Sequence, residues 1–235
     1  MIRKEKDGLV WFEFEILQQF PFIRHGCFTR KGGPLGSLNV SEQENRACIE
    51  KILSSSLTNL NQVHGTRILP LPIPDPKTPC DGVITDQKGR GLMIKHADCQ
   101  ACLFLDPKRR VIGAAHAGWR GSVQNIYKET VLSLQTQYGS QPEDLIACIG
   151  PSLSPSKSEF INWEKELPPS FSRFQTGVHF DFWAITCHQL EECGLLPEHI
   201  EVSRLCTFSA PDLFFSFRRS NRGLKRNNAT CITLV

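Results

Sequence analysis

Residues 95–121 read KHADCQACLFLDPKRRVIGAAHAGWRG. Two apolar runs in this stretch, ACLFL and VIGAA, flank the turn sequence DPKR at positions 106–109. Short apolar runs joined by a turn of this composition predict a β-hairpin. Because a hairpin brings its two open ends together, we expect Cys99, just before the first strand, to lie beside His116, just after the second.

A neighbouring thiol and imidazole have two chemical interpretations. They can form a nucleophile pair, in which the imidazole activates the Cys99 thiolate, or they can be two ligands of a metal ion. His64, in the polar sequence NQVHG, is the candidate third ligand. Two imidazoles and a thiolate suit zinc or copper, and three protein ligands with one open position are typical of catalytic zinc. The plainer alternative is that each histidine only makes hydrogen bonds within a core or turn.

Two aspartates lie close to these residues in the sequence. Asp98 precedes Cys99, and Asp81 lies in the turn sequence PCDG. Either carboxylate can orient a ligand imidazole, as the outer carboxylates of metal sites do, or serve only as a turn residue. His96 is expected on the opposite face of its strand from Cys99, in a structural or supporting role.

The sequence Gly118-Trp119-Arg120-Gly121 opens a predicted helix. Free N–H groups at a helix start attract an anion, and the guanidinium of Arg120 adds a forked cation. Arg120 therefore predicts a phosphate or carboxylate contact. Pairing with a structural carboxylate is the alternative.

Further short runs of apolar and β-branched residues predict additional strands. They are Leu9–Phe14, Phe20–Phe28, Thr66–Leu69, Gly82–Thr85, Gly91–Lys95, Ile200–Leu205, Leu213–Phe217 and Thr230–Val235. The proline-rich stretch at 70–77 separates two of them and is expected to be a rigid surface loop.

Helical spacing of apolar residues occurs in three segments. The first follows a capping-box pattern at Ser41 and Glu44, the second is Ser122–Tyr138, and the third starts after Asp181 and stops at Gly194. Strands interspersed with few helices predict an α/β (mixed α+β) fold, a layered sandwich of mixed β-sheet with flanking helices. We expect residues 1–235 to form a single domain.

The composition excludes several classes of protein. Net charge is +3, with 27 basic and 24 acidic residues, which is too balanced to indicate nucleic-acid binding. No apolar stretch approaches the roughly 20 residues that span a bilayer, and no signal-peptide pattern precedes the first strand. We therefore expect a soluble, monomeric, cytoplasmic protein with no membrane partner. The basic stretches at 3–6 and 218–226 are either solvated surface or an anion-binding patch.

Ten cysteines raise the question of disulfides. Several lie inside apolar runs, including Cys148 and Cys231. A buried free cysteine behaves as a small apolar side chain. Most of the ten are therefore expected to be reduced core residues, as is usual in the cytosol.

Three ordered motifs, NQVHG at 61–65, HADC at 96–99 and HAGWRG at 116–121, resemble those of the laccase-like multicopper polyphenol oxidases, a family now mostly described as purine nucleoside phosphorylases. Nearly the whole chain takes part in the resemblance. Companion motifs are HGCFTRKGG at 25–33, SLN at 37–39, GP at 150–151, DFW at 181–183, CT at 206–207 and FSFRR at 215–219.

This resemblance implies a sandwich fold related to bacterial toxin deamidases that use a Cys–His pair. It implies zinc held by His64, Cys99 and His116, which would also be the catalytic residues, with copper able to occupy the same site. The implied reaction is phosphorolysis of adenosine, inosine and S-methyl-5′-thioadenosine, with adenosine deamination alongside. Arg30, Asn39 and Arg120 are the implied substrate-binding residues, and purine nucleosides and phosphate the implied partners.

The sequence departs from the family pattern in two loops. SLSPSKSEF at 152–160 replaces a block that usually contains Cys and Tyr, and LKR at 224–226 replaces Thr-Gly-Arg. A multicopper oxidase needs more imidazoles than the seven histidines of this chain supply. The alternative that stays open is a metal-free Cys–His amide hydrolase acting on peptidoglycan precursors.

Overall fold

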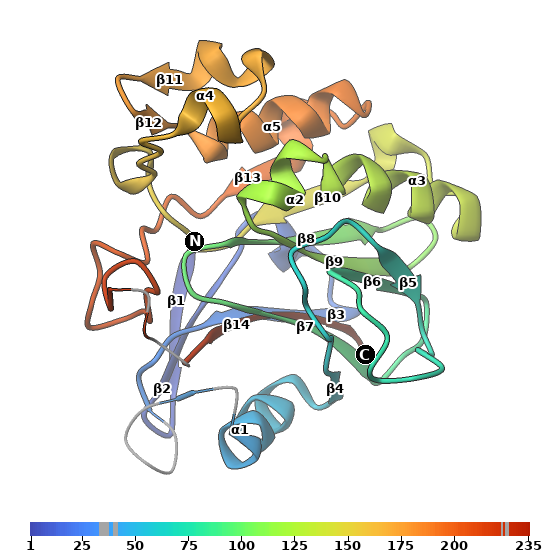
Figure 1. Ribbon diagram of the computed structural model, residues 1–235. Coiled ribbons are helices and arrows are strands. Elements are labelled where there is room, and N and C mark those ends of the chain that lie inside the picture. Colours follow the sequence, from blue (N-terminus) through green and yellow to red (C-terminus); the bar gives the residue numbers. More distant parts are fainter. Residues whose placement is uncertain (33–37, 40–41, 222, 224–225) are drawn as a thin grey trace.

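The computed structural model describes residues 1–32, 38–39, 42–221, 223 and 226–235. Two six-stranded sheets pack face to face, and helices cover the outer face of each sheet (Figure 1). The layer order is helix, sheet, sheet, helix. This arrangement confirms the predicted layered sandwich of mixed sheets with flanking helices. The implied relation to toxin deamidases stays a prediction.

The first sheet contains both ends of the chain. Its strands, in spatial order, are β1 (Ile2–Lys6), β2 (Leu9–Glu13), β3 (Ile23–Phe28), β14 (Asn228–Leu234), β7 (Arg90–His96) and β4 (Ser56–Thr58). All neighbours are antiparallel except β4 and β7. Helix α1 (Gln43–Leu53) covers the outer face, where Ile49 and Leu53 are buried against the sheet.

The second sheet carries the predicted hairpin at its centre. Its strands, in spatial order, are β13 (Ile200–Val202), β10 (Ile146–Ile149), β8 (Gln100–Asp106), β9 (Val111–Ala117), β6 (Gly82–Thr85) and β5 (Ile68–Pro70). Helices α3 (Ile126–Tyr138) and α5 (Phe182–Glu192) cover its outer face (Figure 1).

Apolar side chains from both sheets fill the space between them. Leu92 and Ile94 of β7 pack in the same cluster as Leu103 and Leu105 of β8, and all four are at most 1% exposed. Since β8 is covered on both faces, its five central residues, 101–105, are continuously apolar rather than alternating.

A cap of short elements lies above α2 (Trp119–Val123) and α5 (Figure 1). It contains α4 (Trp163–Glu166), β11 (Gln175–Thr176) and β12 (His179–Phe180). Phe160, Phe171 and Phe180 pack with Phe182 in a separate aromatic cluster. Short 3-10 helices occur at Ile16–Gln19, Pro142–Asp144, Pro155–Lys157, Pro169–Phe174 and Pro197–His199.

The hairpin prediction is confirmed. Strands β8 and β9 pair antiparallel, with Ala101 opposite His116 and Asp106 opposite Val111. The Asp106 carboxylate accepts hydrogen bonds from the backbone N–H groups of Lys108 and Arg109, at 3.0 and 2.9 Å. Those bonds fix the tight turn.

The prediction of a strand at Leu213–Phe217 is wrong, because Leu213 and Phe217 lie in turns and residues 214–216 have no regular secondary structure. Phe214 and Phe215 are nevertheless buried. The side chain of Asn228 accepts from the Phe215 N–H at 2.9 Å and donates to its carbonyl at 2.9 Å. The Arg219 guanidinium donates to the Phe214 carbonyl. Side chains thus satisfy backbone groups that a strand would have paired. The predicted strand from Phe20 also starts only at Ile23.

The helix predicted over Ser122–Tyr138 is two helices, α2 and α3. They are separated by Asn125, whose φ of 57° is left-handed. The Asn125 side chain accepts from the Lys128 N–H at 3.1 Å, so it caps the second helix. Asp181 caps α5 as predicted, accepting from the Ala184 N–H at 2.9 Å. The capping residue predicted at position 41 lies outside the described residues. Within the described ranges, no helix is both long and apolar enough to cross a bilayer.

Candidate metal centre

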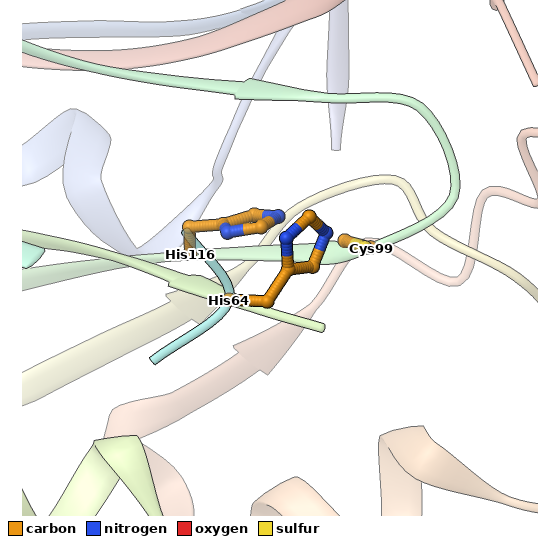
Figure 2. Close-up of side chains that lie close together, drawn as sticks. All are labelled: His64, Cys99 and His116. Atoms are coloured by element: carbon orange, nitrogen blue, oxygen red, sulfur yellow. The ribbon is translucent and has the colours of Figure 1, made fainter. Parts of the chain in front are cut away.

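Three side chains come together where β8 begins and β9 ends, at one end of the central strands of the second sheet (Figure 2). They are His64, Cys99 and His116. One ligand atom from each residue lies within 4.8 Å of the other two. His116 is buried, Cys99 is half-buried and His64 is exposed. The two imidazole rings meet edge to face, with centroids 4.8 Å apart.

The chain path explains this convergence. His64 lies in the segment that leaves β4 in the first sheet and enters β5 in the second, and Cys99 lies in the turn from β7 to β8, which makes the same crossing. His116 is near the end of β9, next to β8. The Gln62 side chain donates to the Lys95 carbonyl at 2.8 Å and accepts from its N–H at 3.0 Å. These bonds tie the segment that carries His64 to the end of β7, just before the turn that carries Cys99.

One carboxylate, that of Asp81, orients two of the three residues. Its Oδ1 pairs with His116 Nδ1 at 2.8 Å and accepts from the His64 N–H at 2.9 Å. Its Oδ2 accepts from the N–H groups of Val63 and Gly65 at 3.1 and 2.8 Å. Because Nδ1 of His116 is occupied, its Nε2 is left for a metal ion.

Backbone conformation adds to this positioning. His64 has φ = 63°, which is uncommon for a residue with a side chain, and the Asp81 hydrogen bond to its N–H helps to hold it there. Gly118 packs against the site so closely that a Cβ there would lie 2.7 Å from Cδ2 of His64 and 3.4 Å from Sγ of Cys99.

The electrostatics favour a thiolate. Burial alone would raise the pKa of Cys99, but His116 and then His64 lower it to about 6. Burial alone would lower the pKa of His116, but the hydrogen bonds that its ring donates to Asp81 and Cys99 raise it to about 9. In metal-free protein, Cys99 and His116 therefore form a thiolate–imidazolium pair between about pH 6 and about pH 9.

The donor set fits a tetrahedral metal ion. Zinc bonds of 2.0–2.3 Å separate neighbouring ligand atoms by about 3.3–3.6 Å, which a small closure of the present cluster would reach. One thiolate and two imidazoles leave a fourth position for water or substrate. The same thiolate and imidazole could instead act as a nucleophile and its base, so the geometry alone permits both chemistries.

A cavity of about 520 Å³ opens beside Cys99. Its apolar wall includes Trp119, Phe160, Phe182 and Phe217. Its polar side chains include two guanidinium groups and three carboxylates: Arg120, Arg218, Asp98, Glu159 and Glu166. A cavity of this size and mixed lining is typical of a small-molecule site.

The predicted substrate-binding residues fall in different places. Arg120 lines the cavity, with its guanidinium carbon 4.3 Å from the Trp119 ring centroid, and no carboxylate of the described residues forms an ion pair with it. Arg30 and Asn39 are not among the described residues that line the cavity. Arg30 lies over Phe215 and donates to the Pro211 carbonyl. The Asn39 side chain donates to Glu42 and accepts from the Asn227 N–H.

Asp98 and His96 have structural partners. Asp98 accepts from the Thr207 hydroxyl and the Arg218 N–H, each at 2.7 Å, and makes no hydrogen bond to the imidazole of His64 or His116. The carboxylate beside the His116 imidazole is that of Asp81. Nε2 of His96 lies 2.9 Å from the Thr230 hydroxyl, in a fully buried environment that lowers the pKa of the imidazole to about 3.

Sequence comparison assigns the chain to a family. A family described as "Multi-copper polyphenol oxidoreductase laccase" matches residues 24–234, nearly the entire chain. The chain belongs to this family. Despite the copper in that description, His64, Cys99 and His116 are the one group of three or more potential metal ligands within the described part of the chain.

Relatives of this chain carry the name purine nucleoside phosphorylase. A protein of that name from Bacteroides thetaiotaomicron is 37% identical over 149 residues, covering 59% of this chain and 55% of the relative. YlmD from Bacillus subtilis is 37% identical over 148 residues, covering 59% and 53%. The alignments thus span only about half the length of these relatives. One from Xylella fastidiosa (Temecula1) is 31% identical over 207 residues, covering 81% and 78%.

Solved structures share the whole fold. The Bacillus licheniformis hypothetical protein YfiH superposes with a TM-score of 0.85 at 26% identity, covering 99% of each chain. YlmD from Geobacillus stearothermophilus gives 0.84 at 27% identity, covering 98% of this chain and 97% of its own.

Proposed function

We propose that this protein is a purine nucleoside phosphorylase with a zinc centre at His64, Cys99 and His116. Its substrates would be adenosine, inosine and S-methyl-5′-thioadenosine, with adenosine deamination as an accompanying activity. The observation that carries the proposal is the convergence of the three potential ligands beside a cavity with aromatic walls and unpaired guanidinium groups. The names of the relatives agree with it.

The cavity suits both parts of a nucleoside. A purine is a flat aromatic ring, and Trp119, Phe160 and Phe217 offer apolar faces to it. The hydroxyl groups of a ribose are hydrogen-bond donors, and the carboxylates of Glu159 and Glu166 lie in the same lining. Arg120 would hold the phosphate. Arg30 and Asn39 stay predicted substrate residues, although neither is among the described residues that line the cavity.

The reaction would be a displacement at the ribose C1′. An oxygen of phosphate forms a bond to C1′ while the bond from C1′ to the purine nitrogen breaks, and the bonding electron pair and a proton end on the released base. Holding phosphate and nucleoside in line supplies most of the rate gain in such a reaction. When bound, zinc would supply Lewis acidity and a water acidified toward neutrality. Asp81 keeps His116 in the required tautomer.

A Cys–His amide hydrolase acting on peptidoglycan precursors is the second candidate. The lowered pKa of Cys99 beside His116 favours it, because a thiolate is the reactive form of a cysteine nucleophile. A metal-bound Cys99 would not be free to attack. The two candidates therefore differ in whether metal is required for activity.

Metal analysis and product analysis together test the proposal. Protein purified without chelator is expected to contain about one zinc per chain. Incubation with adenosine should release adenine only when phosphate is present, and inosine should form in either case. The Cys99→Ala variant should lose metal and both activities. Full activity in metal-free protein or in Cys99→Ala would refute the zinc assignment.

A further inference from the structure

Two consecutive arginines, Arg218 and Arg219, follow Phe217, and their side chains have different partners. The guanidinium of Arg219 donates to the backbone carbonyls of Thr207, Phe208 and Phe214. These bonds fix its donors within the loop. Arg219 is therefore a structural residue that holds the loop together.

Arg218 belongs to the cavity instead. Its backbone N–H donates to Asp98 Oδ2 at 2.7 Å, which fixes this residue beside the turn that carries Cys99. Asp98 is itself held by Thr207 and adopts a left-handed φ of 95°. From that anchor the side chain lines the cavity and reaches the cap, where Nη2 donates to the Glu159 carbonyl at 3.0 Å.

The guanidinium of Arg218 has N–H donors left for a ligand. Five N–H donors are available to it, and the Glu159 carbonyl uses one. Within the described ranges, no carboxylate forms an ion pair with it, although the carboxylates of Glu159 and Glu166 line the same cavity. Arg120 lines the cavity from α2, so two unpaired guanidinium groups from different elements share one small space.

We propose that Arg218, together with Arg120, binds the phosphate dianion that attacks the nucleoside. Two forked cations on separate elements suit the several oxygens of a phosphate better than the two oxygens of a carboxylate. The carboxylates that share the lining are left to accept from hydroxyl groups. This inference rests on the proposed function and adds to it a phosphate ligand from the loop at 215–219.

Phosphate kinetics of Arg218→Gln test the inference. The Michaelis constant for phosphate is expected to rise about 10- to 100-fold, the loss that follows removal of a charge-assisted hydrogen-bond donor, while that for inosine changes less than about two-fold. Arg218→Lys, which keeps the charge but not the fork, should fall between. Arg173→Gln is the matched control, since this exposed arginine lies over Phe174, outside the cavity lining. A general loss of packing would raise the Michaelis constants for both substrates. The inference is overturned if the Michaelis constant for phosphate is unchanged, or if that for inosine rises instead.

Thermal unfolding gives a readout that needs no activity. Inorganic phosphate, compared with chloride at equal ionic strength, should raise the melting temperature of the wild type and of Arg173→Gln but not of Arg218→Gln. An equal rise in all three, or none in any, overturns the inference. If Arg218→Gln loses stabilisation by adenosine monophosphate but keeps that by inorganic phosphate, the site holds a nucleotide's phosphate and the inference is also overturned.

The two proposals fail in distinguishable ways. Wild-type protein that releases no base from any purine nucleoside refutes the phosphorylase, whereas the melting experiment still decides whether Arg218 binds phosphate. Wild-type phosphorolysis with unchanged phosphate kinetics in Arg218→Gln refutes the inference alone.

Discussion

Asp81→Asn is expected to weaken metal binding without touching a metal ligand. The carboxylate accepts four hydrogen bonds, two on each oxygen, from His116, His64, Val63 and Gly65. An amide has one acceptor oxygen, so in either orientation its NH2 group faces two donors that it cannot satisfy.

The magnitude follows from those contacts. Hydrogen bonds to a charged group contribute about 1.5–3 kcal/mol each, so losing two should lower the free energy of unfolding by at least about 3 kcal/mol. Burial alone would raise the pKa of Asp81, but the hydrogen bonds from His116 and the backbone lower it, so the wild-type carboxylate is ionised at neutral pH. Loss of an outer carboxylate of this kind typically weakens metal binding by about 10- to 100-fold.

Competition with a chromogenic chelator measures the zinc affinity, and urea unfolding of metal-free protein measures the stability. Asp144→Asn is the matched control, because Asp144 is paired with the exposed Lys108 at 2.7 Å in a surface contact. It should change neither quantity by much. A folded Asp81→Asn protein whose zinc affinity equals that of the control would refute the positioning role of Asp81.

Three further perturbations probe the site and its support. Gly118→Ala should displace His64, since the new Cβ would lie 2.7 Å from that ring, and equilibrium dialysis should show about 10-fold weaker zinc binding. In metal-free protein, mapping of iodoacetamide adducts by mass spectrometry should show Cys99 alkylation rising with pH around a midpoint of about 6, because the thiolate forms above that pKa. Zinc should suppress the alkylation. A midpoint near pH 9 would contradict the ion pair of Cys99 and His116. Tyr127→Phe removes a hydroxyl that donates to Gln100 at 2.8 Å, so urea unfolding should show a loss of about 1–2 kcal/mol. Its zinc affinity should stay at the wild-type value.

Local sequence signals predicted the hairpin because a turn and two apolar runs are continuous in the chain. They also placed Cys99 and His116 at one edge of it. The sequence permits two roles for Asp81, a carboxylate that orients an imidazole or a plain turn residue. The choice between them depends on the pairing of β6 with β9, which sets Gly82 opposite Ala115. Nothing local in the sequence specifies that strand order.

The cavity was less accessible to sequence reasoning than the ligands. Arg218 directly follows the segment Leu213–Phe217, whose apolar residues predict a strand, but the side chain of Asn228 takes the place of the strand pairing at Phe215. Once that segment folds as turns, Arg218 and Phe217 reach the cavity. The one signal available in the sequence was Asn228, a polar residue at the start of the following strand. Its side chain can bond both the N–H and the carbonyl of a buried residue.

Two of the segments that cross from the first sheet to the second carry a residue of the candidate metal site, His64 between β4 and β5 and Cys99 between β7 and β8. A metal ion bound there would link the two crossing segments, and its ligands would converge only while the two sheets are packed together. Its binding energy would therefore be lost in a single step when the sheets separate, and not in the fraying of an individual strand. Amide hydrogen exchange should record this as slower exchange throughout the interior of both sheets on metal loading, including β3 and β10, which contribute none of the three candidate ligands.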